Sequence, residues 1–355
     1  MSEQFVGTMP VQERHRFDVA PLERYLRANV EGFTGPLTVE QFKGGQSNPT
    51  YRLLTPNARY AMRTKPGPAA KLLPSAHAVE REYLVMTSLA RAGIPVPRTF
   101  VLCEDESVTG RAFFVMDFVE GRILWEQSLP GMTNGERAAI YDEMNRVIAA
   151  LHSVDYATIG LADYGKPGNY FARQIGRWTK QYQMSETEKI EAMDNLIAWL
   201  PQNIPPGDET SIVHGDYRLD NLIFHPTEPK ILAILDWELS TLGHPLADFS
   251  YHCMSWHIPP GTFRGIAGLD IAALGIPSER EYVAAYCRRT GRESIPHWDF
   301  YIAYNMFRLA GILQGIMKRA LEGTASSQQA LDAGSRARPM AEMGWKVVEE
   351  RILRK

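Results

Sequence analysis

The chain has 355 residues, 45% of them hydrophobic, which is enough apolar material for two packed cores. Its formal net charge of −3 argues against a nucleic-acid partner, and no basic run suggests binding to a membrane surface. The N-terminal segment has no apolar signal-peptide core, no apolar run is long enough to cross a bilayer, and the three cysteines lack metal-ligand spacing. We therefore expect a cytoplasmic protein, and the sequence leaves open whether it is a monomer or a homodimer.

The first part of the chain predicts a β-rich region. Three β-prone runs follow one another, at 38–42, 51–54 and 59–63. The first connection contains Gly44 and Gly45, whose amides can approach phosphates in a hairpin, and Ser47 adds a side-chain donor. On the last run Arg63 and Lys65 lie on the same face, and either can bind phosphate. Arg63 is favoured because a guanidinium can hold phosphate with two hydrogen bonds.

An amphipathic helix is predicted next, over residues 76–91, where apolar residues recur at helical spacing. An acidic residue of this helix could pair with Arg63 or Lys65, and Glu82 is one candidate. Glu80 is the alternative, and either residue could instead be a solvated glutamate on the helix surface. An apolar strand follows over 111–119, and the region beyond it, including an amphipathic segment at 136–152, is predicted to be mostly helical.

The most specific motif lies at residues 212–237. An apolar pair leads into a polar loop with His214, Asp216 and Asn221, and two apolar runs joined by a turn then return the chain to Asp236. Two carboxylates and an amide oxygen suit Mg²⁺. Phosphoryl transfer uses such a set, with one Asp facing the attacking hydroxyl while an Asn and a second Asp hold the metal. The alternative is that Asp216 and Asn221 only form the turn.

This motif resembles the catalytic loop of the aminoglycoside phosphotransferase family, which shares the protein-kinase-like fold. An HGD triplet stands where protein kinases have HRD, and a bare Asp-Trp pair stands where they have DFG. The resemblance implies ATP and Mg²⁺ as cofactors. The residue roles that it implies are Asp216 as the catalytic base, Asn221 and Asp236 as metal ligands, and His214 and Asp248 as structural supports.

Longer segments resemble the kinase-like N-terminal domain of acyl-CoA dehydrogenase family members 10 and 11; they lie at 63–83, 172–182, 234–251 and 307–323. The fold implied is α+β and protein-kinase-like, with the active site in a cleft between a small β-rich N-lobe, residues 1–119, and a larger, mostly helical C-lobe, residues 120–355. Asp117 and Val119 then fall at the hinge, where backbone groups pair with adenine. The implied activity is phosphorylation of a hydroxyl, such as that of a hydroxyacyl-CoA or a related hydroxy acid.

The acceptor is the least specified part of this prediction. Aromatic and basic residues of the helical half are candidates for the substrate wall: Arg173, Trp178, Trp256, His257, Tyr304 and Arg308. Basic residues outnumber acidic ones from residue 300 on, which argues against a polycationic acceptor. The alternatives are an aminoglycoside- or choline-type kinase, a catalytically silent nucleotide-binding pseudokinase, and a metal-dependent hydrolase using His214, Asp216 and Asp236.

Overall fold

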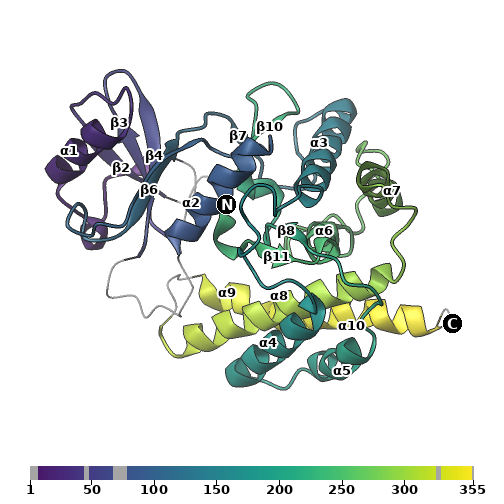
Figure 1. Ribbon diagram of the computed structural model, residues 1–355. Coiled ribbons are helices and arrows are strands. Elements are labelled where there is room, and N and C mark those ends of the chain that lie inside the picture. Colours follow the sequence, from purple (N-terminus) through teal and green to yellow (C-terminus); the bar gives the residue numbers. More distant parts are fainter. Residues whose placement is uncertain (1–6, 44–47, 67–77, 325–328, 354–355) are drawn as a thin grey trace. The chain divides into compact units, whose positions relative to one another are not determined.

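The computed structural model describes residues 7–43, 48–66, 78–324 and 329–353, so the predicted phosphate contacts Gly44, Gly45 and Ser47 lie outside the described residues (Figure 1). The chain divides into two compact units. Unit 1 comprises Met1–Ile123, Ile159–Leu161 and Asp220–Leu239, and unit 2 comprises Leu124–Thr158, Ala162–Leu219 and Ser240–Lys355. The 212–237 motif is therefore shared between them.

Unit 1 is built on an antiparallel sheet of six strands in the order β1-β2-β3-β4-β6-β5. Its strands are β1 (Thr8–Met9), β2 (Thr38–Phe42), β3 (Thr50–Leu54), β4 (Arg59–Thr64), β5 (Thr99–Cys103) and β6 (Phe113–Asp117). Two α-helices, α1 (Val19–Asn29) and α2 (Val79–Arg91), and the short helix η2 (Glu13–His15) accompany the sheet. The predicted strand runs and the helix at 76–91 are confirmed, with the helix beginning three residues later.

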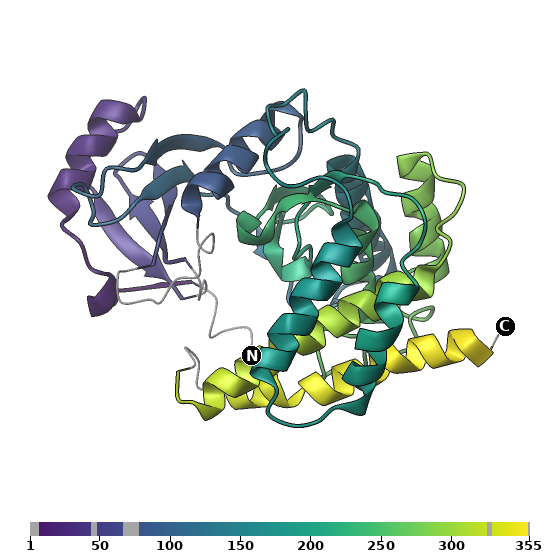
Figure 2. The same ribbon diagram turned by 60° about the horizontal axis from the view of Figure 1, so that its bottom comes forward.

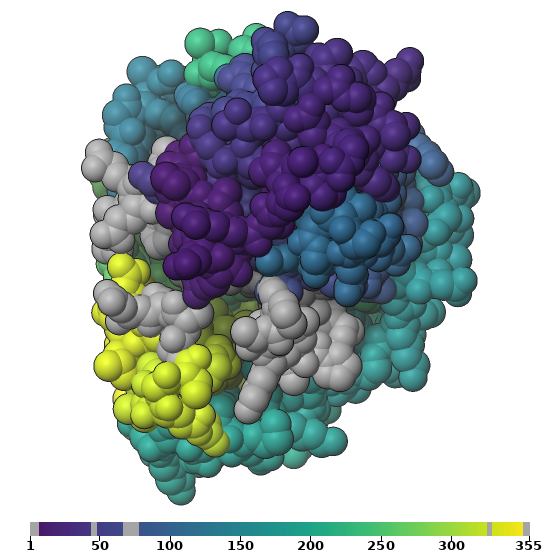
Figure 3. All heavy atoms as spheres, turned by 90° about the vertical axis from the view of Figure 1, so that its left-hand side faces the viewer, coloured from purple at the N-terminus to yellow at the C-terminus, as the bar shows by residue number. Residues whose placement is uncertain are grey.

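The core of this unit forms between α1 and the sheet. Leu22 and Leu26 of α1 are fully buried against strand residues such as Leu53 and Phe113, and burial of each such side chain stabilises the unit by about 1.5–3 kcal/mol. The ring of Tyr25 meets that of Phe113 edge-on at 5.8 Å. Figure 3 shows this face of unit 1, where the N-terminal segment and α1 (purple) adjoin the segment around β5 and β6 (blue).

A smaller sheet in unit 1 contains the two apolar runs of the 212–237 motif. It has the order β10-β9-β7, from β7 (Arg122–Ile123), β9 (Leu222–Phe224) and β10 (Ile231–Ile234). The antiparallel pairing of Leu222 with Ile234 confirms the predicted hairpin. The hairpin is preceded by the short helix η4 (Leu219–Asn221) and followed by η5 (Trp237–Leu239).

Unit 2 is mostly helical, as predicted. Its α-helices are α3 (Asn134–His152), α4 (Tyr170–Ser185), α5 (Glu191–Trp199), α6 (Pro245–Cys253), α7 (Glu279–Thr290), α8 (Trp298–Leu321), α9 (Ala330–Ser335) and α10 (Ala337–Leu353). The short helices η3 (Leu200–Gln202) and η6 (Met254–Trp256) and a two-stranded ladder of β8 (Ser211–Val213) and β11 (Thr241–Gly243) complete it. The long, apolar α8 packs against α4, α6, α9 and α10 (Figure 2). Among the helices of the described ranges, none combines the length and apolarity needed to cross a membrane.

Candidate functional site

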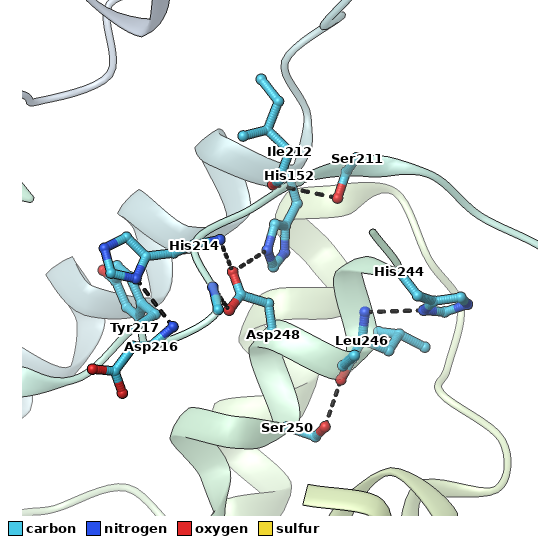
Figure 4. A network of polar contacts seen from close by, with 12 residues as sticks. His152, Ser211, Ile212, His214, Asp216, Tyr217, His244, Leu246, Asp248 and Ser250 are labelled. Atoms are coloured by element: carbon cyan, nitrogen blue, oxygen red, sulfur yellow. Dashed lines mark hydrogen bonds and ion pairs between the residues drawn. The ribbon is translucent and has the colours of Figure 1, made fainter. Parts of the chain in front are cut away.

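The loop after β8 is held by a buried carboxylate from α6. Asp248 Oδ2 accepts the His214 backbone N–H at 2.7 Å, and Asp248 Oδ1 accepts the Gly215 N–H at 2.8 Å. The same Oδ2 lies 3.2 Å from Nε2 of His152, at the end of α3 (Figure 4). The ring of His214 stays inside the loop, where its Nδ1 accepts the Asp216 N–H at 3.2 Å. The loop backbone is therefore fixed by groups from two helices.

Asp248 is charged within this buried network. Burial alone would raise its pKa, but the hydrogen bond and charge of His152, together with His214, lower the pKa below its ordinary value. The resulting stabilisation is fully present above the pKa of an unfolded aspartate, about 3.9, and is lost as the pH falls below that value.

Asp248→Ala is expected to lower the free energy of unfolding by about 3 kcal/mol, because two buried N–H groups and His152 lose their acceptor. Urea unfolding at neutral pH would measure the change. Asp194→Ala, which removes an exposed carboxylate 3.9 Å from Lys189 on the surface, is the matched control and should leave the midpoint unchanged. Equal midpoints for the two variants would show that Asp248 does not brace the loop.

The Asp216 carboxylate projects from this loop and is held at both oxygens. Tyr251 of α6 donates its hydroxyl to Oδ1 at 2.8 Å, and Arg218 Nε lies 3.1 Å from Oδ2. The Asp216 side chain is 16% exposed to solvent. The orientation of the Asp216 carboxylate is thus fixed, and the carboxylate remains partly exposed to solvent. A group that contacts a substrate needs both properties.

Arg308 supports the same loop from α8. Its Nη2 donates to the Gly215 carbonyl at 2.7 Å, and its guanidinium lies 5.1 Å from the Tyr251 ring and 5.8 Å from the Trp178 ring. Gly215 has a φ of +82°, a left-handed conformation that glycine adopts without steric cost. Arg308 and Tyr304 also line one small cavity with Gly215 and Asp248. Arg308 therefore lies beneath the loop and contacts its backbone.

In unit 1, Arg63 of β4 forms ion pairs with three carboxylates. Its Nε lies 2.9 Å from Glu82 Oε1 on α2, and its Nη2 lies 2.7 Å from Asp236 Oδ1 and 3.3 Å from Glu238 Oε2. Burial lowers the pKa of Arg63, but these acidic groups outweigh it and raise the pKa overall. Burial raises the pKa of Glu82, against the opposing effects of Arg63 and of the Asn48 amide 2.9 Å away.

Asp236 occupies an unusual backbone position. It lies two residues beyond the end of β10 and has a φ of +66°, which costs a non-glycine residue about 1–2 kcal/mol. The Leu235 N–H donates to the Asn221 carbonyl at 2.8 Å, so the ends of the hairpin that carry Asn221 and Asp236 are joined by a backbone hydrogen bond. Strained conformations of this kind concentrate at functional sites.

The acidic cluster around Arg63 fits a magnesium ion that is shared with phosphates. Asp236 and Glu238 face the same guanidinium nitrogen, and Asn221, which precedes the hairpin, is joined to Leu235 through its backbone carbonyl. Within the described residues, no set of three or more His, Cys, Asp or Glu side chains is arranged to hold a metal alone. Mg²⁺ usually takes one or two carboxylates, with waters and substrate phosphates completing its octahedron.

The other residues singled out in the sequence have local partners. Lys65 pairs with Glu80 at 3.0 Å, separately from the Arg63–Glu82 pair. Asp117 ends β6, and Val119 follows it in the chain. Three of the candidate substrate residues are tied to nearby groups: Arg173 to the Lys166 carbonyl at 2.6 Å, Trp256 to the Pro277 carbonyl at 3.0 Å, and His257 to Glu279 at 2.8 Å.

Three residues of the site were not singled out from the sequence. Arg218 and Tyr251 contact the Asp216 carboxylate, and Glu238 joins the cluster around Arg63. Arg218 and Glu238 each follow a predicted site aspartate by two residues. Their closeness in sequence to these aspartates could have identified them as site residues. Tyr251 is distant from Asp216 in the sequence, and only the packing of α6 brings the two together.

His252 is a buried histidine next to this region. Its Nε2 has no hydrogen-bond partner among the residues that the structure describes. Burial lowers the pKa of His252 from 6.5 to about 4, against the opposing charge of Asp248. The unfolded chain binds a proton at this residue near pH 6.5 and the folded chain does not, so the free energy of unfolding falls as the pH drops from 6.5 toward 4.

The free energy of unfolding should fall less with acid in His252→Gln than in the wild type. The expected difference in this loss between neutral pH and about pH 5 is about 1–2 kcal/mol. Urea unfolding at several pH values would measure the slope. His225→Gln changes a half-buried histidine on the turn between β9 and β10 and serves as the control. If H252Q kept the wild-type slope, the acid sensitivity would belong to other groups.

Comparisons with known proteins place this chain in a family. The model of the phosphotransferase enzyme family matches residues 38–308. Acyl-CoA dehydrogenase family member 10 of Mus musculus is 46% identical over 342 residues, which are 96% of this chain but 32% of that protein. Member 11 of Rattus norvegicus is 43% identical over 345 residues, which are 95% of this chain and 44% of that protein. The chain thus spans less than half the length of these relatives.

Solved structures agree with this assignment. A crystal structure from Ralstonia eutropha, provisionally described as an aminoglycoside phosphotransferase, is 67% identical with a TM-score of 0.88, covering 94% of this chain and 99% of that one. A mutant of aminoglycoside phosphotransferase APH(4)-Ia, solved with AMP-PNP and hygromycin B, is 15% identical with a TM-score of 0.60, covering 92% and 98%, and shows the fold alone. The predicted α+β, protein-kinase-like fold is confirmed. The chain belongs to the phosphotransferase enzyme family.

Proposed function

We propose that this protein is an ATP- and Mg²⁺-dependent kinase that phosphorylates a hydroxyl group of a small molecule. The observation that carries the proposal is the Asp216 carboxylate, held by Tyr251 and Arg218 on a loop that Asp248 fixes through its backbone. In phosphoryl transfer an aspartate at such a position orients the attacking hydroxyl, and catalysis is mostly positioning and charge neutralisation.

The nucleotide and phosphate contacts in this proposal lie in unit 1. Arg63, kept in place by Glu82, binds ATP phosphates, with Lys65, Gly44, Gly45 and Ser47 as further phosphate contacts. Asp117 and Val119 mark the segment whose backbone pairs with adenine. These roles belong to an N-lobe that ends at residue 119, and residues 120–355 form the C-lobe.

Asn221 and Asp236 would hold Mg²⁺, which when bound neutralises charge on the phosphates. Asp216 accepts the proton of the acceptor hydroxyl as its oxygen bonds to the γ-phosphorus. The bond from that phosphorus to the β–γ bridging oxygen breaks, and ADP leaves with the electron pair. Support for ATP comes from the complex of APH(4)-Ia with AMP-PNP, an ATP analogue.

The acceptor in this proposal is a hydroxyacyl-CoA or a related hydroxy acid, in a cytoplasmic setting. Its support is the similarity to acyl-CoA dehydrogenase family members 10 and 11. Arg173, Trp178, Trp256, His257, Tyr304 and Arg308 remain candidates for the acceptor wall, and Arg308 also contacts the loop at the Gly215 carbonyl.

Phosphate transfer from γ-labelled ATP with Mg²⁺ would test the proposal, with hydroxyacyl-CoAs, hydroxy acids, aminoglycosides, choline and sugars as acceptors. Label in one acceptor class, absent without Mg²⁺, is the expected result. Magnesium-dependent ATP binding without label in any acceptor would favour a nucleotide-binding pseudokinase. No ATP binding at all would overturn the proposal.

A further inference from the structure

Arg111 of unit 1 is a buried cation whose charge is not compensated. Arg111 and Arg63 are equally buried, each with 9% exposure, but Arg63 has three carboxylates around it. The Nε and Nη1 atoms of Arg111 are buried and have no hydrogen-bond partner among the described residues, and none of the carboxylates described there forms an ion pair with it. A buried charge without a partner is strongly destabilising, so this guanidinium calls for an anion.

The backbone around Arg111 is well held. Gly110 adopts a left-handed φ of +80° just before it. The Thr109 hydroxyl donates to the Arg111 carbonyl at 2.9 Å, and the Lys65 N–H donates to the Ala112 carbonyl at 3.1 Å. The unpaired guanidinium therefore belongs to a fixed turn that leads into β6, which limits how far its side chain can move to find a partner.

The side chain of Arg111 lies near Tyr51 and His15. Burial raises the pKa of Tyr51, and the positive charge of Arg111 opposes that rise. Burial lowers the pKa of His15, and the charges of Arg14 and Arg111 act in the same direction. Tyr51 and His15 are themselves in contact, since the Tyr51 hydroxyl donates to the His15 carbonyl at 3.1 Å. The surroundings of Arg111 are therefore polar and positively charged.

This region lies on the opposite face of the sheet from Arg63. Arg63 is paired across the sheet with Phe114, and directly opposed residues share a face. Phe113 precedes Phe114 on the strand and so faces the other way, into the core that also contains Tyr51 and α1. An anion held by Arg111 beside Tyr51 would therefore be separated by the sheet from phosphates held by Arg63.

We propose that Arg111 binds a small oxyanion of the phosphate or sulfate type, at a second anion site of unit 1 on the α1 side of the sheet. A guanidinium pairs with such oxyanions through charge-assisted hydrogen bonds, and the Nε and Nη1 donors of Arg111 are available for them. The bound oxyanion compensates the buried charge. The inference is independent of the proposed kinase function, because Arg111 takes part in no step of the transfer.

Phosphate titration of the full chain without nucleotide tests the site. Sodium phosphate would replace sodium chloride at constant ionic strength, with binding followed by phosphorus NMR and by the thermal midpoint. The wild type should show a saturable rise of a few degrees, and Arg111→Met should lose the part due to this site. Phosphate bound at Arg63 affects both proteins equally, so their difference reports Arg111. Arg24→Met, which changes an exposed arginine on α1, should behave as the wild type does, and equal phosphate responses of R111M and the wild type would overturn the proposal.

Stability in phosphate-free chloride is a second readout. Methionine keeps much of the apolar volume and removes an unpaired charge, so R111M should unfold there at the wild-type temperature or above it. A clearly lower midpoint would show that the fold itself compensates the charge, and would overturn the proposal. Arg111→Lys keeps the charge without the planar guanidinium and should bind phosphate more weakly than the wild type but more tightly than R111M.

ATP binding distinguishes this site from the nucleotide site. R111M should bind ATP with Mg²⁺ at the wild-type affinity, because Arg63 and its carboxylates lie on the other face of the sheet. A tenfold loss of ATP affinity in folded R111M would make Arg111 a nucleotide contact and overturn the assignment of a separate site. If phosphate binds as expected but no acceptor is labelled from ATP, the Arg111 site stands and the proposed kinase function fails.

Discussion

Asp216→Asn is expected to lower the rate of phosphate transfer by about a thousandfold or more while ATP still binds. An asparagine keeps the shape of the side chain and an oxygen that can accept the Tyr251 hydroxyl, which lies 2.8 Å from the native carboxylate. It cannot accept the proton of the attacking hydroxyl. The defect should therefore appear in kcat, with little change in the affinity for ATP.

The measurement is label transfer from γ-labelled ATP to the preferred acceptor, beside a separate titration of ATP binding. Asp163→Asn, which removes an exposed carboxylate on a loop of unit 2, is the matched control and should turn over at the wild-type rate. Because D216N also loses the charge facing Arg218, its thermal midpoint must be compared with the wild type. Normal turnover by a folded D216N would remove Asp216 from the reaction.

Much of this architecture could be predicted because it depends on short-range sequence patterns. The hairpin of β9 and β10 follows from two apolar runs around a turn, and the family motif marks the residues that end it. Arg63 was favoured by its position relative to the family's lysine and by guanidinium chemistry, Glu82 by its similarity in position to a helix glutamate of the family, and the structure brings them to 2.9 Å. This pair was therefore accessible through the family resemblance.

The remaining part of the site depends on tertiary packing that no spacing rule encodes. Tyr251 reaches Asp216 because α6 begins at Pro245 and packs on α8, which turns that residue toward the loop. Arg308 was predicted as a substrate residue, which stays a prediction, and its contacts with the Gly215 carbonyl and the Tyr251 ring could not be foreseen. In both cases the sequence indicates the residue type on a helix, and the rotation of that helix in the packed unit decides what the side chain touches.

Asp236→Asn is expected to remove the magnesium dependence of ATP binding. The native carboxylate lies 2.7 Å from Arg63 Nη2, and an asparagine oxygen can keep that contact. Asparagine also tolerates the left-handed backbone at this position, so the substitution removes the charge and spares the fold. Loss of a carboxylate ligand should weaken Mg²⁺-dependent nucleotide binding by about a hundredfold, and transfer should fall with it.

Titration of ATP with and without Mg²⁺ would separate the metal from the phosphate contacts. In the wild type the metal should tighten ATP binding, and in D236N the two titrations should converge on the metal-free value. Asp236→Gly relieves the backbone strain but also lacks the carboxylate, so it should bind nucleotide as D236N does even if its thermal midpoint differs. A D236N protein that still bound ATP more tightly with Mg²⁺ would place the metal on other oxygens, and the acidic cluster at Arg63 would then serve only to hold that arginine.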